Sequence, residues 1–421
     1  MTVAEVKGTF KLVCLGCRVN QYEIQSYRDQ LTFLGYREAT DVDPCDLCII
    51  NTCAVTRSAE SSGRHAVRQV CRQNPEAFLV VTGCLSEADK NFFSSLGRQC
   101  LLVSNKDKHQ LMEKIFPHLK ELPEFRIRSF EGKSRAFIKV QDGCNSFCSY
   151  CIIPYLRGRS RSRPAENILK EVSDLISQGF REVVLAGINV GDYNDGSHTL
   201  ADLIRKVDNL ENIERIRISS IDPEDVDQSL QEAIIFGKHT CHSSHLVLQS
   251  GSNAILRLMN RKYSRKDFLH CVESLRSLDP QYTFTTDVIV GFPGETEQDF
   301  EETLRIIQDV GFIKVHIFPF SPRERTKAYT LPSQVPPSVI YERKKYLASV
   351  AEEVAYLEMK KRIGGTYSVL VEKIDDQGIA HGHTSYFDMV CFPSDSKVFV
   401  NTMVDVRIDS VEEGILRGNR I

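Results

Sequence analysis

The segment DGCNSFCSYC, residues 142–151, constrains this chain more than any other part of its sequence. It places Cys144, Cys148 and Cys151 in a C-x3-C-x2-C array directly after the apolar segment AFIKV, which we predict to be a strand. A single short loop with this spacing can bring three thiolates to one cubane iron–sulfur cluster and leave the fourth iron without a protein ligand. A small molecule can then chelate that open iron, so the array predicts a cluster with an exchangeable site.

Structural zinc is the main alternative for closely spaced cysteines, but zinc sites need a second pair at a matched distance. The downstream thiols of Cys241 and Cys271 do not supply one. The chain has 14 cysteines and no apolar run of signal-peptide length at its start, which favours metal ligands in a reducing compartment over disulfides. No segment approaches the roughly 18 to 20 apolar residues of a membrane span. We therefore expect a cytoplasmic protein without a membrane partner.

Six apolar segments separated by helix-length stretches predict a central partial (β/α)6 barrel. They cover residues 136–140, 182–188, 214–219, 245–249, 284–291 and 313–320. Active sites of such barrels lie at the carboxyl ends of the strands. Our cofactor-site candidates are the strand-end residues: Gly187, Asn189, Ser219, Ser220, Gln249, Asp287, Gly291 and residues 318–321. Taken singly, each also has a plain explanation as a turn glycine, a cap or loop packing.

A second set of cysteines is grouped by strand ends rather than by spacing. Apolar segments alternate with helical stretches over residues 8–117, which predicts a doubly wound α/β domain with a parallel sheet. Cys17, Cys53 and Cys84 each end one of its strands. Because the carboxyl ends of parallel strands meet at one edge, the three thiols should converge there. The alternative, that they are small buried hydrophobes, suits the other cysteines of this domain better: Cys14, Cys45, Cys48, Cys71 and Cys100.

The remaining domain boundaries follow from prolines, charge and short strands. We place the central barrel at residues 132–330, a helical connector at 331–362 and a small all-β barrel at 363–421. The last of these holds five Lys/Arg against nine Asp/Glu, which makes it a poor binder of phosphate by itself.

Several motifs resemble the radical S-adenosylmethionine methylthiotransferase family over essentially the whole chain. They are GCRVNQYE, NTCAVT, VVTGC, DGCNSFCSYCIIPYLRGRSRSR, LQSGSNAILRLMNRKY and TTDVIVGFPGETEQDF. The resemblance implies that Cys144, Cys148 and Cys151 hold a [4Fe–4S] cluster whose open iron chelates S-adenosylmethionine. It also implies that Tyr150, the aromatic residue before the last cysteine, contacts the adenine of that molecule, with plain loop packing as the alternative. It implies a second [4Fe–4S] cluster at the strand-end cysteines, where sulfur is presented for insertion. The C-terminal barrel resembles the family's RNA-binding TRAM domain.

The reaction implied by this resemblance converts an unactivated C–H group to C–SCH3. Radical chemistry suits such a carbon because it offers no acidic proton to a general base. The motifs look most like the branch that modifies N6-threonylcarbamoyladenosine next to the anticodon of tRNA. Other branches act on N6-isopentenyladenosine in tRNA or on an aspartate of a ribosomal protein, and a non-catalytic metal-bearing RNA-binding protein is an alternative of another class. An electron donor and a sulfur donor are further implied partners, and we expect a monomer.

Four arginines follow the cysteine loop closely and are candidates for contacts with anticodon phosphates. They are Arg157, Arg159, Arg161 and Arg163. The guanidinium group matches phosphate geometry well. The alternative is a loop whose arginines are solvated or paired with carboxylates.

Overall fold

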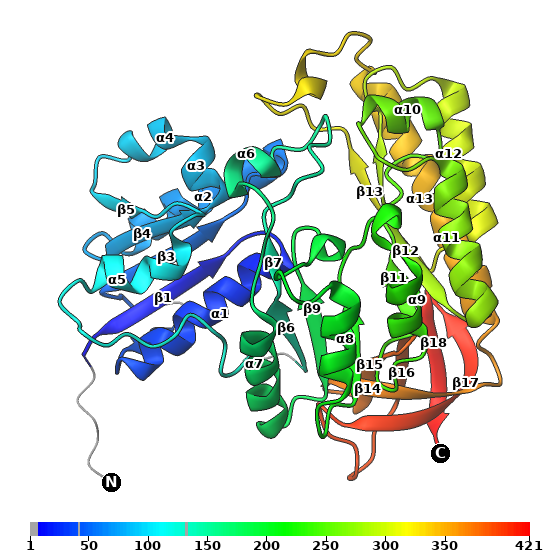
Figure 1. Ribbon diagram of the computed structural model, residues 1–421. Coiled ribbons are helices and arrows are strands. Elements are labelled where there is room, and N and C mark those ends of the chain that lie inside the picture. The colour runs from blue at the N-terminus through cyan, green and yellow to red at the C-terminus, as the bar shows by residue number, and fades with distance from the viewer. Residues whose placement is uncertain (1–6, 41–42, 131–133) are drawn as a thin grey trace.

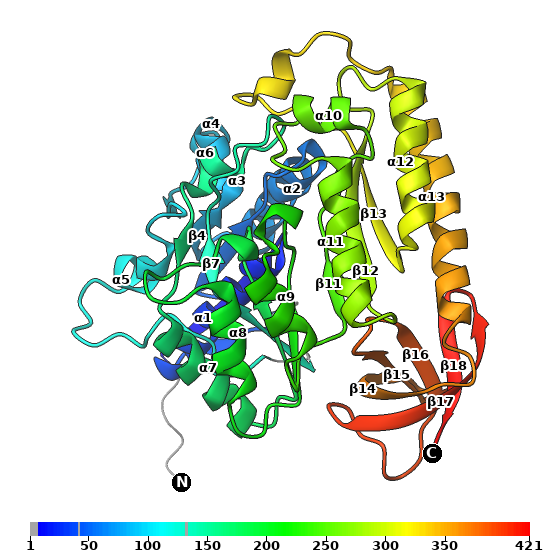
Figure 2. The ribbon, with the colours of Figure 1, turned by 45° about the vertical axis from the view of Figure 1, so that its right-hand side comes forward.

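The computed structural model describes residues 7–40, 43–130 and 134–421 and divides into three regions. The N-terminal domain packs beside a larger central barrel, and a small C-terminal barrel lies below the central strands (Figures 1 and 2). The predicted start of the central barrel, residue 132, falls outside the described residues. Within the described ranges, no helix has the length and apolar character needed to cross a membrane.

The N-terminal domain is a five-stranded parallel sheet in the order β2-β1-β3-β4-β5. Its strands are β1 (Thr9–Cys14), β2 (Arg37–Glu38), β3 (Leu47–Thr52), β4 (Phe78–Gly83) and β5 (Cys100–Leu102). Its helices are α1 (Arg18–Phe33), α2 (Arg57–Gln73), α3 (Cys84–Ala88), α4 (Lys90–Ser94), η1 (Lys108–Gln110) and α5 (Leu111–Ile115). One apolar cluster joins the sheet to α1 and α5, and another joins it to α2 and α3. Helices cover both faces, which confirms the predicted doubly wound sheet.

The central barrel consists of two three-stranded parallel sheets, β10-β9-β6 and β11-β12-β13. Its strands are β6 (Arg135–Lys139), β9 (Glu182–Ala186), β10 (Arg215–Ile218), β11 (Ser243–His245), β12 (Thr283–Val290) and β13 (Lys314–Pro319). Isolated bridges from Ile216 to Thr240 and from Ile221 to Leu246 join the two sheets. The predicted partial six-stranded barrel is therefore confirmed, and β11 is shorter than the apolar run that predicted it.

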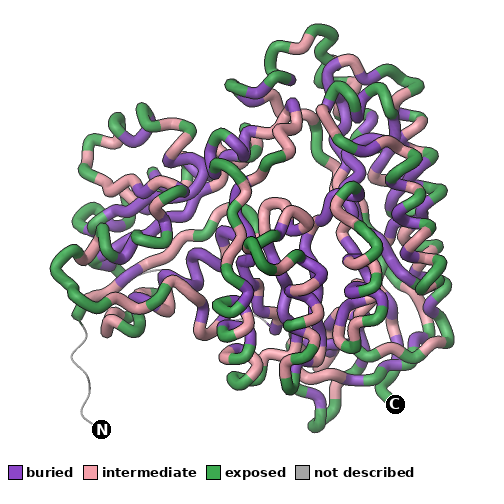
Figure 3. Tube along the Cα trace, in the orientation of Figure 1, coloured by how far each residue is buried: buried purple, intermediate pink, exposed green. Residues whose placement is uncertain are grey.

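Helices surround the outer face of this barrel and share one continuous apolar core with it, as the buried segments of Figure 3 show. They are α7 (Ala165–Ser177), α8 (Leu200–Asp208), α9 (Gln228–Ile235), α10 (Asn253–Leu258), α11 (Arg265–Leu278) and α12 (Glu297–Val310). Shorter elements are β7 (Gln141–Asp142), α6 (Ile153–Arg157), β8 (Arg161–Ser162), η2 (Val190–Asp192), η3 (Pro223–Asp225) and η4 (Lys327–Thr330).

Local sequence explains where these helices begin. The start of α12 is a capping box, in which the Asp299 backbone N–H donates to Thr296 Oγ1 at 3.2 Å. The Thr296 N–H in turn donates to the Asp299 carboxylate at 2.9 Å. The same box starts α8 and α11. Each box satisfies two otherwise free N–H groups, so it fixes the residue at which the helix leaves the strand-end loop.

The chain leaves the barrel through α13 (Pro337–Lys360) and ends in a closed five-stranded barrel. The strands of this barrel are β14 (Thr366–Ile374), β15 (Ile379–Thr384), β16 (Met389–Pro393), β17 (Met403–Glu412) and β18 (Ile415–Arg420). It packs against the amino ends of the central strands: Arg215 donates to His383 O at 2.9 Å, and Arg135 pairs with Glu372 at 3.1 Å. The carboxyl ends of the central strands stay on the opposite side.

Candidate active site

The first group of thiols lies where the strand order of the N-terminal sheet reverses. Cys17 follows β1, Cys53 follows β3 and Cys84 directly follows β4, and these strands are neighbours. Gly83 has φ +91°, and a Cβ there would lie 2.3 Å from the carbonyl oxygen of Thr52, so only glycine lets the two strand ends meet. Burial raises the pKa of Cys53 to about 11, with the charges of Cys84 and Cys17 adding to the shift. The three thiols therefore share one site.

A buried charged network supports this first triad. Its members are Lys108, Lys139, Arg157, Glu23 and Asp142. Lys108 Nζ lies 2.5 Å from Glu23 and 2.6 Å from Asp142, and Arg157 Nη1 lies 2.9 Å from Asp142. Three cations face two carboxylates, which leaves an excess of positive charge. Cys84 and Cys17 lie close enough to Arg157 for their charges to raise its pKa. This excess favours a negatively charged, thiolate-bound group.

The second triad lies in the loop between β7 and α6, at the mouth of the barrel. The segment after α10 holds this loop in place: the Ser149 N–H donates to Met259 O at 2.9 Å, and Asn260 Nδ2 donates to Phe147 O at 3.0 Å. Gly143, before the first cysteine, has φ +75°, and a Cβ there would lie 2.1 Å from Arg159 O. The loop is therefore shaped by its own glycine and by residues more than a hundred positions away.

One buried arginine contacts the second triad directly. Arg261 Nη1 donates to Cys148 Sγ at 3.1 Å, while its other nitrogens contact Asp222 and Tyr263. This contact places a buried positive charge directly against the Cys148 sulfur. Burial raises the pKa of Cys151 to about 12, with Cys148 adding to the shift.

The spacing of the thiols fits an iron–sulfur cluster better than a single ion. A zinc ion binds each sulfur at about 2.3 Å, which needs sulfurs less than about 4 Å apart. In neither triad do all three sulfurs lie within 4.8 Å of one another. Within the described ranges, the group whose ligand atoms meet that limit consists of His245, Asp287 and His316. The two triads are thus too open for one ion and suit a larger group.

The two triads face each other across one apolar cluster. Cys84 belongs to it together with Ile152 and Ile153 of the second loop, and Cys144 and Cys151 pack against it. Contacts on the far side of the mouth complete this arrangement: the Arg57 N–H donates to Ser321 Oγ at 3.1 Å, and Arg323 pairs with Glu60. The N-terminal domain therefore covers the carboxyl ends of the central strands, with both triads at the joint.

Comparison with protein families divides the chain in the same way. Residues 9–103 match a family described as "Uncharacterized protein family UPF0004", residues 138–307 match the radical SAM superfamily, and residues 360–420 match the TRAM domain. The radical SAM match implies a [4Fe–4S] cluster and S-adenosylmethionine.

Relatives match the whole chain rather than parts of it. A threonylcarbamoyladenosine tRNA methylthiotransferase from Chlamydia pneumoniae is 70% identical over 419 residues, 99% of each chain. The chain belongs to the radical S-adenosylmethionine methylthiotransferase family. A second threonylcarbamoyladenosine tRNA methylthiotransferase, from Thermotoga maritima, is 34% identical over 97% of this chain and 96% of its own. A tRNA-2-methylthio-N(6)-dimethylallyladenosine synthase from Desulfitobacterium hafniense is 32% identical over 99% of this chain and 98% of its own.

Solved structures support the fold alone. A radical S-adenosylmethionine methyltransferase, TsrM from Kitasatospora setae, superposes with a TM-score of 0.58 at 13% identity and covers 76% of this chain and 77% of its own. OxsB, a cobalamin-dependent S-adenosylmethionine radical enzyme, gives a TM-score of 0.51 at 13% identity, covering 82% of this chain and 56% of its own. Family membership makes this protein an enzyme, which removes the non-catalytic alternative.

Most predicted cofactor residues of the enzyme lie around the barrel mouth. The Tyr150 ring packs edge-on against Phe292 at 6.3 Å. The N–H of Asn189, close to Gly187, donates to Gln141 Oε1 at 3.1 Å. The Ser219 N–H donates to Leu185 O at 3.0 Å, which ties it to the end of β9.

Two of the predicted residues, Asp287 and Gly291, lie at different positions along β12 and the turn that follows it. Gly291 has φ +73°, and its N–H donates to Glu295 Oε2 at 2.8 Å, so it forms the turn after the strand. Asp287 lies deeper, inside the barrel, 3.3 Å from His245 Nε2. Between them in depth, the Gln249 N–H donates to Asp287 O at 2.8 Å. The rule that site residues follow strand ends therefore holds for Gly291. Asp287 instead lies within β12, before the carboxyl end of that strand.

The four predicted RNA-binding arginines divide into two kinds. The prediction for Arg157 is wrong: its side chain is 1% exposed and serves the charged network described above. Arg163 pairs with Glu171 at 2.8 Å and donates to the Tyr22 hydroxyl at 2.9 Å. Arg159 and Arg161 are exposed, and the Arg159 guanidinium stacks on Phe147 at 4.3 Å. Arg157 and Arg163, at the two ends of this segment, thus point inward, and Arg159 and Arg161 between them point outward.

Sequence reasoning missed several charged residues at the joints. Arg215 and Arg217 alternate within β10 and pair with buried Glu182, and Arg217 also donates to Thr384 O at 3.1 Å. The alternation of charge in ERIRIS is the signal that could have found them. Arg362 pairs with Asp388 at 3.1 Å. Some carboxylates of the C-terminal barrel are therefore paired with arginines that lie outside it.

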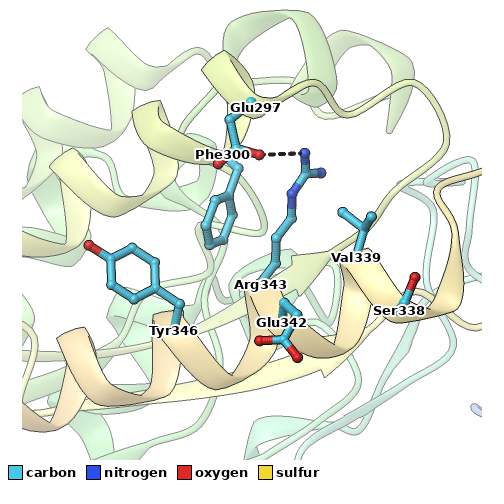
Figure 4. Close-up of a pocket in the computed structure, with 7 residues that line it drawn as sticks. All are labelled: Glu297, Phe300, Ser338, Val339, Glu342, Arg343 and Tyr346. Carbon is cyan, nitrogen blue, oxygen red and sulfur yellow. Dashed lines mark hydrogen bonds and ion pairs between the residues drawn. The ribbon is translucent and has the colours of Figure 1, made fainter.

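A groove lies between α12 and α13 (Figure 4), and no cysteine of either triad lines it. It is lined by Glu297, Phe300, Ser338, Val339, Glu342, Arg343 and Tyr346. Arg343 crosses it to pair with Glu297 at 3.1 Å and with Glu295 at 2.8 Å. These ion pairs hold α13 against the GFPGET turn and the start of α12, which indicates a structural role for the groove.

Proposed function

We propose that this enzyme converts N6-threonylcarbamoyladenosine next to the anticodon of tRNA to its 2-methylthio derivative. The observation that carries the proposal is the 70% identity, over 99% of both chains, to a threonylcarbamoyladenosine tRNA methylthiotransferase. The dimethylallyladenosine synthase from D. hafniense shares 32% over a similar span. The TRAM match at residues 360–420 further supports an RNA substrate.

Each triad has a distinct proposed role. Cys144, Cys148 and Cys151 hold a [4Fe–4S] cluster that, with S-adenosylmethionine, supplies radical chemistry. Cys17, Cys53 and Cys84 hold a second [4Fe–4S] cluster beside the first, where sulfur is presented. Arg261 donates to the Cys148 sulfur at 3.1 Å and so orients this cluster ligand. Arg157 balances the charge of the other triad.

The remaining residues position the substrates and keep water away. Tyr150, Gly187, Asn189, Ser219, Gln249, Asp287 and Gly291 surround the space for S-adenosylmethionine and the adenosine. Arg159 and Arg161, exposed beside the mouth, contact anticodon phosphates. The apolar cluster around Ile152 and Ile153 excludes water from the space between the triads. An electron donor and a sulfur donor are required as further partners.

Mass analysis of tRNA nucleosides tests the proposal. The chain is expressed in a bacterial host that makes N6-threonylcarbamoyladenosine but lacks the methylthio form. The expected result is the appearance of 2-methylthio-N6-threonylcarbamoyladenosine, and none when Cys148→Ala is expressed. Methylthiolation of isopentenyladenosine instead would move the enzyme to that branch. An unchanged tRNA profile together with a modified ribosomal-protein aspartate would overturn the proposal.

A further inference from the structure

The space enclosed by the six central strands, here called the lumen, is lined by charged and polar side chains below the mouth. His245 Nε2 of β11 lies 3.3 Å from Asp287 Oδ1 of β12, and the His245 and His316 rings are 5.8 Å apart. On the other side, Arg217 Nε of β10 lies 2.8 Å from Glu182 of β9. A barrel interior that serves only as a core is filled by branched apolar residues. This one is built to hold something polar.

Arg18 enters the lumen from the N-terminal domain. It is the first residue of α1, which packs beside β6, and its guanidinium lies over the Phe137 ring at 5.6 Å. Its charged neighbours come from three further strands: Glu182 on β9, Arg217 on β10 and Asp287 on β12. Burial lowers the pKa of His316 on β13, and the charge of Arg18 adds to this shift. The Arg18 side chain therefore lies among residues of β6, β9, β10 and β12.

Arg18 differs from the other lumen arginines because they are already paired. Arg217 binds Glu182 and Arg135 binds Glu372, at 2.8 and 3.1 Å. For Arg18, the described part of the chain offers no hydrogen bond and no carboxylate within 4.0 Å. Two more polar atoms of this region are buried. Gln249 Oε1 lacks a hydrogen-bond partner among the described residues, and His245 Nε2 has the Asp287 carboxylate at 3.3 Å. A half-buried guanidinium with free donors is suited to a carboxylate or phosphate ligand.

A metal ion is a weaker explanation of the same residues. His245, Asp287 and His316 have ligand atoms within 4.8 Å of one another and could together bind a divalent ion. The guanidinium of Arg18 acts on both Asp287 and His316, and its positive charge opposes a second cation there. The local charge favours an anion, held by Arg18, with polar groups around it.

The position of Arg18 relates this anion site to the reaction. Arg18 directly follows Cys17, so it lies beside the first triad and hence beside the adenine C2 that receives sulfur under the proposed function. The inference requires the N6 substituent of the same purine to extend into the lumen, where Arg18 has no carboxylate partner among the described residues. A threonylcarbamoyl group carries one carboxylate, whereas an isopentenyl group carries no charge.

We propose that Arg18 binds the carboxylate of the threonylcarbamoyl group and thereby selects this substrate. The inference rests on the proposed function, because it deepens the account of the same site. His245 and Gln249 then provide hydrogen-bond partners for the threonyl hydroxyl and carbamoyl groups.

The test compares two anticodon stem-loop RNAs that differ in one group: N6-threonylcarbamoyladenosine with its free carboxylate, and the same nucleoside as the threoninamide. Equilibrium binding and kcat/KM are measured for each RNA with the wild-type enzyme and with Arg18→Gln. We expect the wild type to prefer the carboxylate by roughly 10- to 100-fold, as for hydrogen bonds to charged groups. Arg18→Gln should treat the two RNAs alike, and Arg18→Lys should restore part of the preference.

Arg68→Gln is the matched control, since Arg68 also stacks on a phenylalanine, at 5.1 Å from the Phe92 ring, but is exposed and outside the lumen. It should keep the wild-type preference. Iron content of Arg18→Gln verifies that the protein is folded and loaded.

Four results would overturn the inference, and the last of them would also overturn the proposed function. A wild type that accepts both RNAs equally would show that the carboxylate is not recognised. An Arg18→Gln variant that keeps the preference would place recognition elsewhere. Equal weakening of both RNAs by Arg18→Gln would assign Arg18 to an RNA phosphate instead. A wild type that methylthiolates neither RNA would remove the proposed function, and the inference with it.

Discussion

The two cysteine triads lie at the same domain interface but are assembled from different kinds of structure. Cys144, Cys148 and Cys151 come from one loop, and that loop is held by backbone contacts with the segment after α10. Cys17, Cys53 and Cys84 come from three strand ends of a different domain, and their proximity depends on the register of the whole sheet. A loop triad can be altered locally, whereas a strand-end triad can be altered only by moving secondary structure. This difference suits one site that exchanges a small ligand and another that is fixed in place.

The charged residues around the two triads also differ in how local they are. The loop triad has one close arginine, Arg261, paired with a single carboxylate, Asp222. The strand-end triad has a five-residue buried network that ties both domains together, since Glu23 lies on α1 and Lys139 on β6. A substitution in this network should therefore lower the stability of the fold, whereas a substitution of Arg261 should affect the loop triad itself.

Removal of one cysteine from each triad should give the largest and most different effects. We expect Cys148→Ala to abolish both S-adenosylmethionine cleavage and methylthiolation. Cys53→Ala should abolish methylthiolation but keep reductive cleavage of S-adenosylmethionine. Each variant, reconstituted without oxygen, should bind about four irons in place of about eight. Iron counting and assay of 5′-deoxyadenosine check this.

Cys271→Ala is the control for these variants because Cys271 is buried in the barrel core, outside both triads. It should keep the full iron content. If Cys53→Ala also kept eight irons, the strand-end triad would not be a cluster site.

Glu23→Gln should destabilise the protein strongly. The side chain is fully buried and lies 2.5 Å from Lys108 and 2.8 Å from Lys139. Its loss leaves three buried cations with one carboxylate, which we expect to cost about 3 to 5 kcal/mol of unfolding free energy. Urea denaturation measures this, with exposed Glu113→Gln as the control. A change below about 1 kcal/mol would contradict a structural role for the network.

Acid should weaken the same network. Burial would raise the pKa of Glu23, but Lys108, Lys139 and Arg157 outweigh it and lower the pKa to about 2. A carboxylate with a depressed pKa stabilises the folded state above its unfolded value, near 4.5, and loses this contribution as the pH falls toward 2. The stability gap between wild type and Glu23→Gln should therefore narrow by about 2 kcal/mol between pH 6 and pH 3. A constant gap would show that Glu23 is not ionised in the folded protein.

Arg159→Ala should have the smallest effect. Arg159 is exposed beside the loop triad, and one lost phosphate contact should weaken tRNA binding on the order of threefold and reduce the salt slope by about 0.7 to 0.9. Fluorescence anisotropy at several salt concentrations measures both. Arg68→Ala, on helix α2, should leave the slope unchanged. The same slope for Arg159→Ala and wild type would remove Arg159 from the RNA surface.

The prediction of these sites from sequence succeeded where a local rule exists. The spacing of Cys144, Cys148 and Cys151 was sufficient for the loop triad, and the strand-end rule placed Cys17, Cys53 and Cys84 on neighbouring strands. It failed for Arg157, because a run of alternating arginines contains no information about which side chains turn inward. It also missed Arg261 and Asp222, whose 39-residue separation hides their contact.

The sequence by itself determined the elements, their order and the residue types at each strand end, because hydrophobic period and cap residues act over a few positions. Only the tertiary structure decided which charges are paired and which are available. Pairing depends on which side chains the packing of the N-terminal domain, the central barrel and the C-terminal barrel buries together. Arg157 and Arg18 illustrate this: both follow a cysteine site in sequence, yet one is neutralised in a buried network and the other has its donors free in the lumen.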